Sequence, residues 1–289
     1  MAWAALSLLA ACGGSGSASP GPTISVAPTA PPTAPPIRTT VPDTTLPSTT
    51  TADTAPETTT EDTAVDTSYG AYTVQADLSL SPTPTPLHQE LWDLLRRVLG
   101  DAATAQFIEG FTVYNDQYSN IDATVLHGQT PGKRLVQVNA RYADNLPQLT
   151  RTFIHEYGHL VTLAGDQVTP DNGGCGTTSV DEGCLRADSY LNSFLNRYWW
   201  SYGQEVYDAL ASPTAMEAFY NAHQSDFVTR YAGTDPLEDI AETWAEFVIK
   251  DAPAGATVAE QKILFLYGFP ALVQLRDEIR ARVGAVVGV

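Results

Sequence analysis

Basic residues are scarce in this sequence. It contains 15 Lys and Arg against 33 Asp and Glu, which gives a formal net charge of -18 at pH 7. A chain with this charge repels the phosphate backbone of nucleic acids and adsorbs weakly to anionic lipid surfaces. We therefore expect no nucleic-acid partner and no membrane contact through a basic patch.

Long apolar runs are also lacking, because no segment reaches the roughly 20 apolar residues that a membrane-spanning helix needs. The chain nevertheless begins with a short apolar stretch that ends in Leu9-Ala10-Ala11-Cys12. It resembles the lipobox of bacterial lipoprotein signal peptides, and the resemblance implies lipid attachment at Cys12 and a place at the outer face of the bacterial cell membrane. The basic segment usual in such signals is missing. The alternative is an apolar terminus with an unmodified Cys12.

Cysteine is rare as well, with three residues in the whole chain. Setting Cys12 aside leaves Cys175 and Cys184, an even pair that encloses a short loop. In an exported protein such a pair predicts a disulfide. A zinc site on the two cysteines is the alternative, but the loop between them offers no His or Cys to complete it.

Core-forming side chains are sparse in the first third of the chain, where Pro, Thr, Ser and Ala dominate. This composition buries too little apolar surface to offset the entropy of ordering the chain. We therefore expect a signal segment at 1–12, a disordered Pro/Thr/Ser-rich linker at 13–80 and one folded domain at 81–289.

The folded part combines a few strands with many helices. Apolar residues recur at helical spacing over 87–98, and strand-like segments follow at 111–115 and 134–139. Beyond Pro147 we expect helices at 147–164, 186–200, 204–211, 214–230, 237–250, 257–267 and 270–283. Strands that precede a run of helices predict the α+β class, mainly helical with a small sheet.

The most informative pattern is H-E-x-x-H, which runs from His155 to His159 inside the helix expected at 147–164. Residues four apart share one helix face, with Cβ atoms about 5 to 6 Å apart, so both imidazoles can reach one Zn²⁺. Glu156 then lies beside the metal, where its carboxylate serves as general base toward the attacking water. A solvated helix with two chance histidines is the alternative.

A catalytic zinc site needs a third protein ligand. Glu238 is the best candidate, because the helix expected at 237–250 places it in an apolar arc where an unpaired carboxylate is costly. Glu242, one turn later, is placed to accept a hydrogen bond from a ligating imidazole and so orient it. The alternative is an ordinary amphipathic helix whose glutamates face water.

Gly158 is unfavourable inside a helix by about 1 kcal/mol relative to Ala, which predicts a close approach of neighbouring backbone at this position. A different expectation concerns 135–138, a strand to which an extended peptide could add, although an interior strand would have the same pattern.

The combined pattern resembles the gluzincin metallopeptidases, which pair H-E-x-x-H on one helix with a ligating glutamate on a later helix. The pattern is similar to that of the catalytic domain of anthrax lethal factor and related surface peptidases, over 147–164 and 227–250. It implies a zincin-like fold, Zn²⁺ as cofactor, a peptide or protein substrate, and support of the transition state by Tyr231. The longer stretch between His159 and Glu238 implies an insertion that contains the disulfide.

These residues together predict a zinc-dependent endopeptidase displayed on the cell surface. Two other classes remain open. One is a zincin scaffold that acts only as a surface binding or adhesion module, and the other is a zinc hydrolase of a non-peptide bond.

Overall fold

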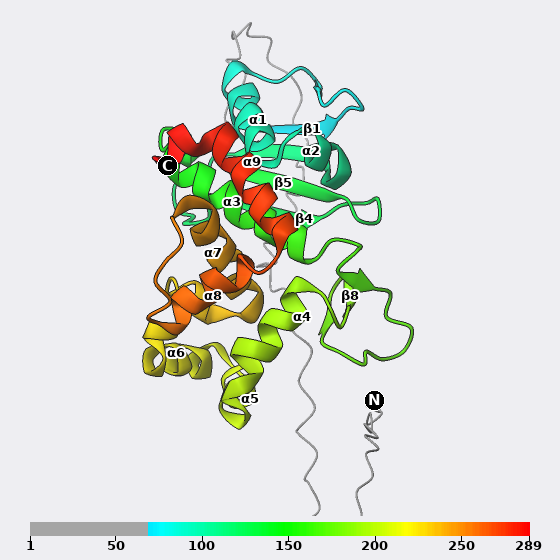
Figure 1. The fold of residues 1–289 in the computed structure, drawn as a ribbon. Helices are drawn as coiled ribbons and strands as arrows, with labels where there is room; N and C mark the ends of the chain where they lie inside the picture. Colours follow the sequence, from blue (N-terminus) through cyan, green and yellow to red (C-terminus); the bar gives the residue numbers. More distant parts are fainter. Residues whose placement is uncertain (1–68) are drawn as a thin grey trace, which may run out of the picture.

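The computed structural model describes residues 69–289 (Figure 1). The signal segment, Cys12 and the linker through residue 68 lie outside the described residues. Within 69–289 the protein is α+β, as the sequence predicts, with many helices, a five-stranded mixed sheet and a three-stranded sheet. In this described part no helix is both long and apolar enough to cross a membrane.

The five-stranded sheet has the order β2-β1-β3-β5-β4. Its strands are β1 (Gly70–Val74), β2 (Leu80–Ser81), β3 (Ile108–Tyr114), β4 (Ala123–His127) and β5 (Arg134–Asn139). β3 and β5 run parallel, and the other neighbouring pairs are antiparallel. Because β5 lies between β3 and β4, the expectation that a peptide adds to 135–138 is wrong. Among the described strands, β4 is the one with a free edge on that side of the sheet.

The sheet begins before the domain boundary expected at residue 81. β1 pairs with β3, and its Tyr72 is buried and shares a 2.7 Å hydrogen bond with Nδ1 of His88. β1 is only five residues long and follows a Thr-rich stretch, so its composition does not separate it from the linker. The folded domain therefore includes 70–80.

Four helices and the five-stranded sheet enclose the larger apolar core. They are α1 (Pro86–Leu99), α3 (Leu146–Thr162), α7 (Pro236–Ile249) and α9 (Pro270–Val287). Each begins with a proline in its first turn, where the missing N–H costs no helical hydrogen bond. The side-chain oxygens of Thr85, Asn145 and Asp235 cap α1, α3 and α7 respectively.

A second apolar cluster is built mainly from helices that lie in the lower part of Figure 1. The shorter helices are α2 (Asp101–Phe107), α4 (Tyr190–Phe194), α5 (Gln204–Ala209), α6 (Pro213–Ala222) and α8 (Val258–Leu266). The helix expected at 186–200 begins later than predicted, at Tyr190 of α4. α4 then continues directly into a π-helical turn. α4, α5 and α6 supply much of this cluster.

The α-helix expected at 214–230 ends at Ala222, and beyond it only a short 3₁₀ turn forms, at Gln224–Asp226. Phe227 has extended backbone, with φ -120° and ψ 139°, and its side chain is buried in the second cluster. Packing of this aromatic ring overrides the helical spacing of its neighbours. The chain between α6 and α7 is thereby free to pass along the face of α7 that carries the site described below.

α3 and α7 are packed closely against each other. A Cβ atom at Gly158 of α3 would lie 2.9 Å from Cδ1 of Trp244 and 3.2 Å from Cα of Ala241, both in α7. Real Cβ contacts of this kind are rarely closer than 3.4 Å. The close approach expected at Gly158 is therefore confirmed.

A buried ion pair also joins α7 to α8. Nζ of Lys262 lies 2.7 Å from Oδ2 of Asp239, and both side chains are fully buried. Nε1 of Trp199 donates to the same oxygen at 2.8 Å, and Nζ lies 4.1 Å from the ring centre of Phe227. Because removal of one partner would leave a buried charge uncompensated, this pair fixes α7 in register.

The far end of α7 is held by α9. Arg276 donates to the carbonyl oxygens of Phe247 and Lys250, and Arg280 also donates to that of Lys250. Cations stabilise the negative end of a helix dipole.

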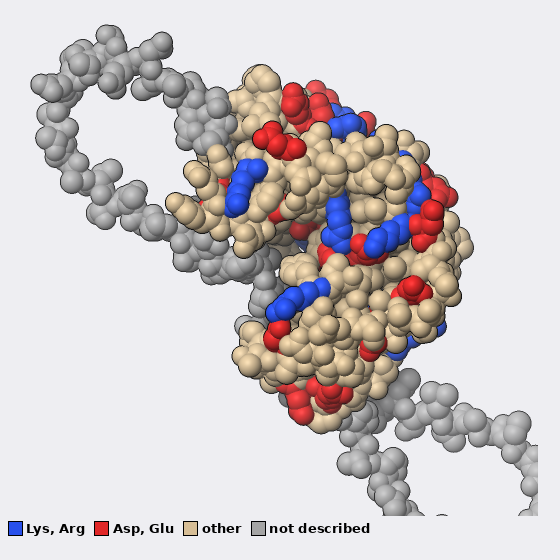
Figure 2. All heavy atoms as spheres, turned by 90° about the vertical axis from the view of Figure 1, so that its left-hand side faces the viewer, with Lys and Arg blue, Asp and Glu red and all other residues tan. Residues whose placement is uncertain are grey.

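On the face shown in Figure 2, basic and acidic side chains lie intermixed and do not form a patch of one sign.

Candidate metal centre

Three donor atoms from α3 and α7 converge on one point. Nε2 of His155 and Nε2 of His159 are 3.2 Å apart, and Oε2 of Glu238 lies 3.1 Å from the first and 3.4 Å from the second. Ligands at about 2.0 to 2.1 Å from a tetrahedrally coordinated ion are about 3.3 Å from one another. The three residues predicted from the sequence therefore form a group that could hold one metal ion.

The hydrogen bond that His155 makes to Glu242 selects the tautomer that a metal ligand needs. Its Nδ1 lies 2.7 Å from Oε1 of Glu242. The carboxylate can only accept a hydrogen bond, so Nδ1 carries the hydrogen. In the neutral ring, the lone pair of Nε2 then points to the place where a metal ion would lie between the three ligand atoms. Oε2 of Glu238 is buried, and its nearest polar neighbours are the two imidazole nitrogens. A cation at this point would satisfy that oxygen.

The acidic surroundings of His155 favour positive charge. Burial disfavours the imidazolium, but the hydrogen bonds to Glu238 and Glu242 outweigh it and raise the pKa of His155 to about 10. Burial raises the pKa of Glu238, but the two neighbouring imidazoles outweigh this effect and lower that pKa well below its usual range. A proton at His155 thus supplies the charge that a metal ion would otherwise bring.

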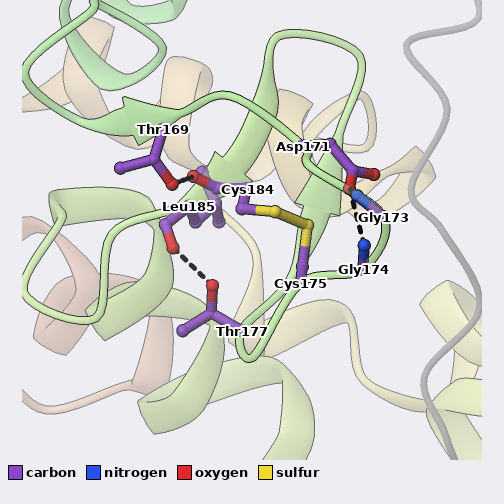
Figure 3. The surroundings of a disulfide bond; sticks show 8 residues. All are labelled: Thr169, Asp171, Gly173, Gly174, Cys175, Thr177, Cys184 and Leu185. Atoms are coloured by element: carbon purple, nitrogen blue, oxygen red, sulfur yellow. Dashed lines mark hydrogen bonds between the residues drawn. A yellow bond between two sulfur atoms is a disulfide. The ribbon is translucent and has the colours of Figure 1, made fainter. Parts of the chain in front are cut away.

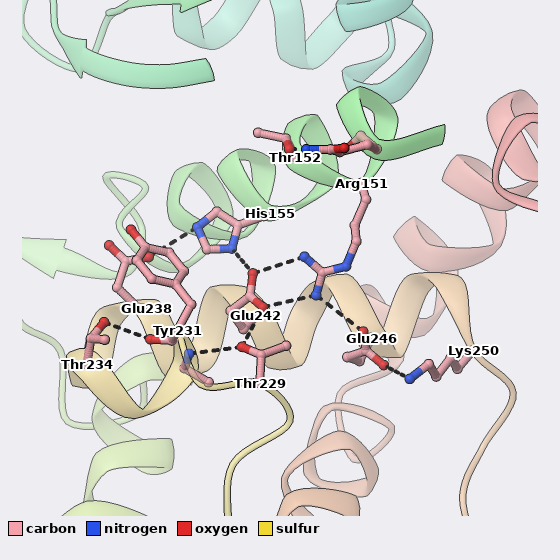
Figure 4. Close-up of polar contacts among 12 residues, drawn as sticks. Arg151, Thr152, His155, Thr229, Tyr231, Thr234, Glu238, Glu242, Glu246 and Lys250 are labelled. Carbon is pink, nitrogen blue, oxygen red and sulfur yellow. Dashed lines mark hydrogen bonds and ion pairs between the residues drawn. The ribbon is translucent and has the colours of Figure 1, made fainter. Parts of the chain in front are cut away.

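Glu242 is held by hydrogen bonds on both of its oxygens (Figure 4). Oε1 accepts from His155, while Arg151 donates to Oε1 at 3.2 Å and to Oε2 at 3.0 Å. The hydroxyl of Thr229 donates to Oε2 at 2.7 Å. Burial raises the pKa of Glu242, but His155 and Arg151 lower it to about 2. Glu242 is therefore an ionised acceptor that orients His155, in the position expected for that role.

The sequence reasoning missed Arg151 and Thr229. Arg151 lies one turn before His155 on the same helix face and also contacts Glu246 at 3.2 Å, so the spacing of four residues was a usable signal. Thr229 lies in a bend between α6 and α7, and no sequence pattern marks it. Glu246 in turn pairs with Lys250, so the ion-pair network continues to the end of α7.

A cavity of about 410 Å³ opens beside the three donors, within the size range of small-molecule and peptide sites. Glu156 and Tyr231 both line it, as do residues of β4. Burial raises the pKa of the Glu156 carboxyl, which makes it a stronger base than a solvated glutamate. The Tyr231 ring lies 5.8 Å from that of His155. Partial burial and the nearby carboxylates raise the pKa of Tyr231, so its hydroxyl remains a donor at neutral pH.

The segment between His159 and α7 contains the disulfide, as expected (Figure 3). Cys175 and Cys184 are bonded, and Cys184 lies in a three-stranded sheet of the order β6-β8-β7. These strands are β6 (Val168–Thr169), β7 (Ser179–Val180) and β8 (Gly183–Leu185). Asp171 lies close to both sulfurs, but their bond to each other removes them as metal ligands.

The turn between β7 and β8 contributes Glu182 to the lining of the cavity. Oε1 of Glu182 lies 3.1 Å from Nη2 of Arg134, the first residue of β5, and both residues line the cavity. The ion pair joins the small sheet to the large one. The disulfide-closed hairpin therefore forms one wall of the cavity.

Comparisons with protein-family models, with curated proteins and with solved structures found no match to this chain.

Proposed function

We propose that this protein is a zinc-dependent endopeptidase. The observation that carries the proposal is the triangle of His155, His159 and Glu238 donors with edges of 3.1 to 3.4 Å, beside which Glu156 lines a cavity. Two imidazole nitrogens and one carboxylate oxygen are a ligand set typical of catalytic zinc sites, which leave one position open. When bound, zinc supplies a Lewis acid that polarises a carbonyl oxygen and makes water more acidic.

The residues of the chain divide the remaining chemistry. Glu156, whose pKa burial raises, takes the proton of the attacking water and passes it to the leaving amine. Tyr231 keeps its hydroxyl hydrogen and donates it to the oxyanion that develops on the scissile carbonyl. Glu242 accepts a hydrogen bond from Nδ1 of His155, which leaves Nε2 of His155 available for the metal.

The free edge of β4 supports a peptide as substrate. Thr124 and Val125 of this strand line the cavity next to Glu156. An extended peptide can add to such an edge through backbone hydrogen bonds, which places its amides along the cavity. A substrate without a regular backbone would gain nothing from this arrangement.

The proposal keeps the location inferred from the first residues, a lipid anchor on Cys12 at the outer face of the cell membrane. That location rests on the sequence alone. The chief alternative function is a zincin scaffold that binds a surface partner without cleaving it, and the base Glu156 distinguishes the two.

The test compares Glu156→Gln with the wild-type protein, and uses Glu90→Gln, an exposed glutamate on α1, as the matched control. Zinc-loaded wild-type protein and the control should cleave members of a peptide library, detected by mass spectrometry. Glu156→Gln should bind zinc normally and lose about 10²-fold or more in rate. A chelator should abolish cleavage and added zinc should restore it. Wild-type protein that binds zinc and cleaves no peptide would overturn the proposal.

A further inference from the structure

One hydroxyl connects the metal ligands to the segment that carries Tyr231. Oγ1 of Thr229 donates to Oε2 of Glu242 at 2.7 Å and accepts from the backbone N–H of Ala232 at 3.0 Å (Figure 4). Glu242 in turn accepts from Nδ1 of His155. An unbroken series of hydrogen bonds thus leads from a ligating imidazole to the residue that follows Tyr231.

The direction of each bond in this series is determined. An ionised carboxylate only accepts, so the single hydrogen of the Thr229 hydroxyl points to Glu242. Its lone pairs are then left for the N–H of Ala232. A serine can make the same two bonds, whereas a valine of the same shape can make neither.

Other contacts also hold this segment, among them the ion pair of Arg230 with Glu217 and the packing of the buried Ala232 in the second apolar cluster. Phe227 is buried in the second apolar cluster. At the other end, a Cβ atom on Gly233 would lie 2.3 Å from the ring of Tyr220, so the backbone is packed directly against that ring. Tyr231 lies between these contacts, with its ring 5.8 Å from that of His155, and is 53% exposed.

We propose that Thr229 is a positioning residue, which acts through Glu242 and Ala232 to hold Tyr231 beside the metal centre and His155 in its ligating orientation. The role attributed to Tyr231 rests on the proposed function, whereas the role at His155 requires only a metal site. A bound metal and a correctly placed Tyr231 are therefore energetically coupled through this hydroxyl.

The test uses three variants of the full chain. Thr229→Val removes the hydroxyl and keeps the shape, and Thr229→Ser restores the hydroxyl. Thr234→Val is the matched control, because its hydroxyl binds the carbonyl oxygen of Tyr231 in the same segment at 2.7 Å but does not bond to Glu242. Zinc affinity should fall about tenfold in Thr229→Val, as for other residues that orient ligands, and remain near wild type in the other two.

A double-mutant cycle with Tyr231→Phe then separates positioning from general loosening. In the wild-type background Tyr231→Phe should lower kcat by about 10²-fold, the effect of removing one oxyanion donor. In the Thr229→Val background the same change should cost less than about tenfold, because residues that act as a unit are not additive. KM should change little in either background.

The outcomes distinguish the two proposals. A wild-type protein that binds zinc and cleaves no peptide removes the endopeptidase and leaves the zinc-affinity comparison to decide the role of Thr229 at His155. Unchanged zinc affinity in Thr229→Val, together with full additivity with Tyr231→Phe, overturns the positioning role. An equal loss in Thr234→Val also overturns it, because the effect would then come from a loosened segment.

Discussion

Adding one methyl group at Gly158 should weaken metal binding, although this residue touches no metal ligand atom. In Gly158→Ala the new Cβ would lie 2.9 Å from Cδ1 of Trp244, about half an ångström closer than the 3.4 Å of an ordinary contact. α3 carries the histidines and α7 carries Glu238, so any separation of these helices pulls the donors apart. Metal sites tolerate errors of about 0.2 Å in ligand distance.

The free energies can be compared. Alanine gains about 1 kcal/mol over glycine as a helix former. Overpacking of a tight interface costs about 1 to 3 kcal/mol, so the metal-free variant should be equal to or less stable than wild type. Zinc affinity should fall roughly tenfold or more, which removes about 1.4 kcal/mol of the stabilisation by zinc.

The assay is a zinc titration against a competing chelator, with thermal unfolding of the zinc-free and zinc-loaded proteins. Gly165→Ala is the matched control, because a Cβ atom there meets nothing within 4 Å. A Gly158→Ala variant that is more stable than wild type and binds zinc equally well would refute the packing argument.

Because the pKa of metal-free His155 is raised to about 10, zinc binding at pH 8 should release about one proton, and the apparent zinc affinity should rise about tenfold per pH unit up to that pKa. Calorimetry in buffers of different ionisation enthalpy measures the number of protons released. Zinc binding without proton release would contradict this prediction. Lys262→Met should lower the free energy of unfolding in urea by about 3 to 5 kcal/mol, and adding Asp239→Asn should recover part of that loss; a neutral single variant would disprove the ion-pair argument. Replacing Cys175 and Cys184 by serine should cost about 2 to 4 kcal/mol of stability, and an unchanged melting temperature would contradict this.

Helical periodicity accounts for most of what the sequence could predict. The spacing of four residues placed His155 and His159 on one face of α3, and the cost of an unpaired carboxylate in an apolar arc singled out Glu238. Both arguments depend on local geometry that a helix fixes. The disulfide was predictable because only one pair of cysteines remained in the folded part.

The contacts that were missed depend on segments that meet only in the folded chain. Thr229 reaches Glu242 because packing of Phe227 turns the chain away from a helix, and the helical spacing of 214–230 hid that turn. β1 and β4 are five residues each and lack a long apolar alternation. The choice of β5 over β4 as the free edge failed because pairing order is set by long-range contacts.

One divalent cation held by His155, His159 and Glu238 is central to the proposed chemistry. Zinc analysis of the purified, reconstituted full-length protein, combined with X-ray absorption at the zinc edge, tests it. We expect one zinc per chain, bound by nitrogen and oxygen at about 2.0 to 2.1 Å, and loss of that zinc in Glu238→Ala. A wild-type protein that retains no zinc, or a Glu238→Ala variant that retains it with the same ligand distances, would contradict the account.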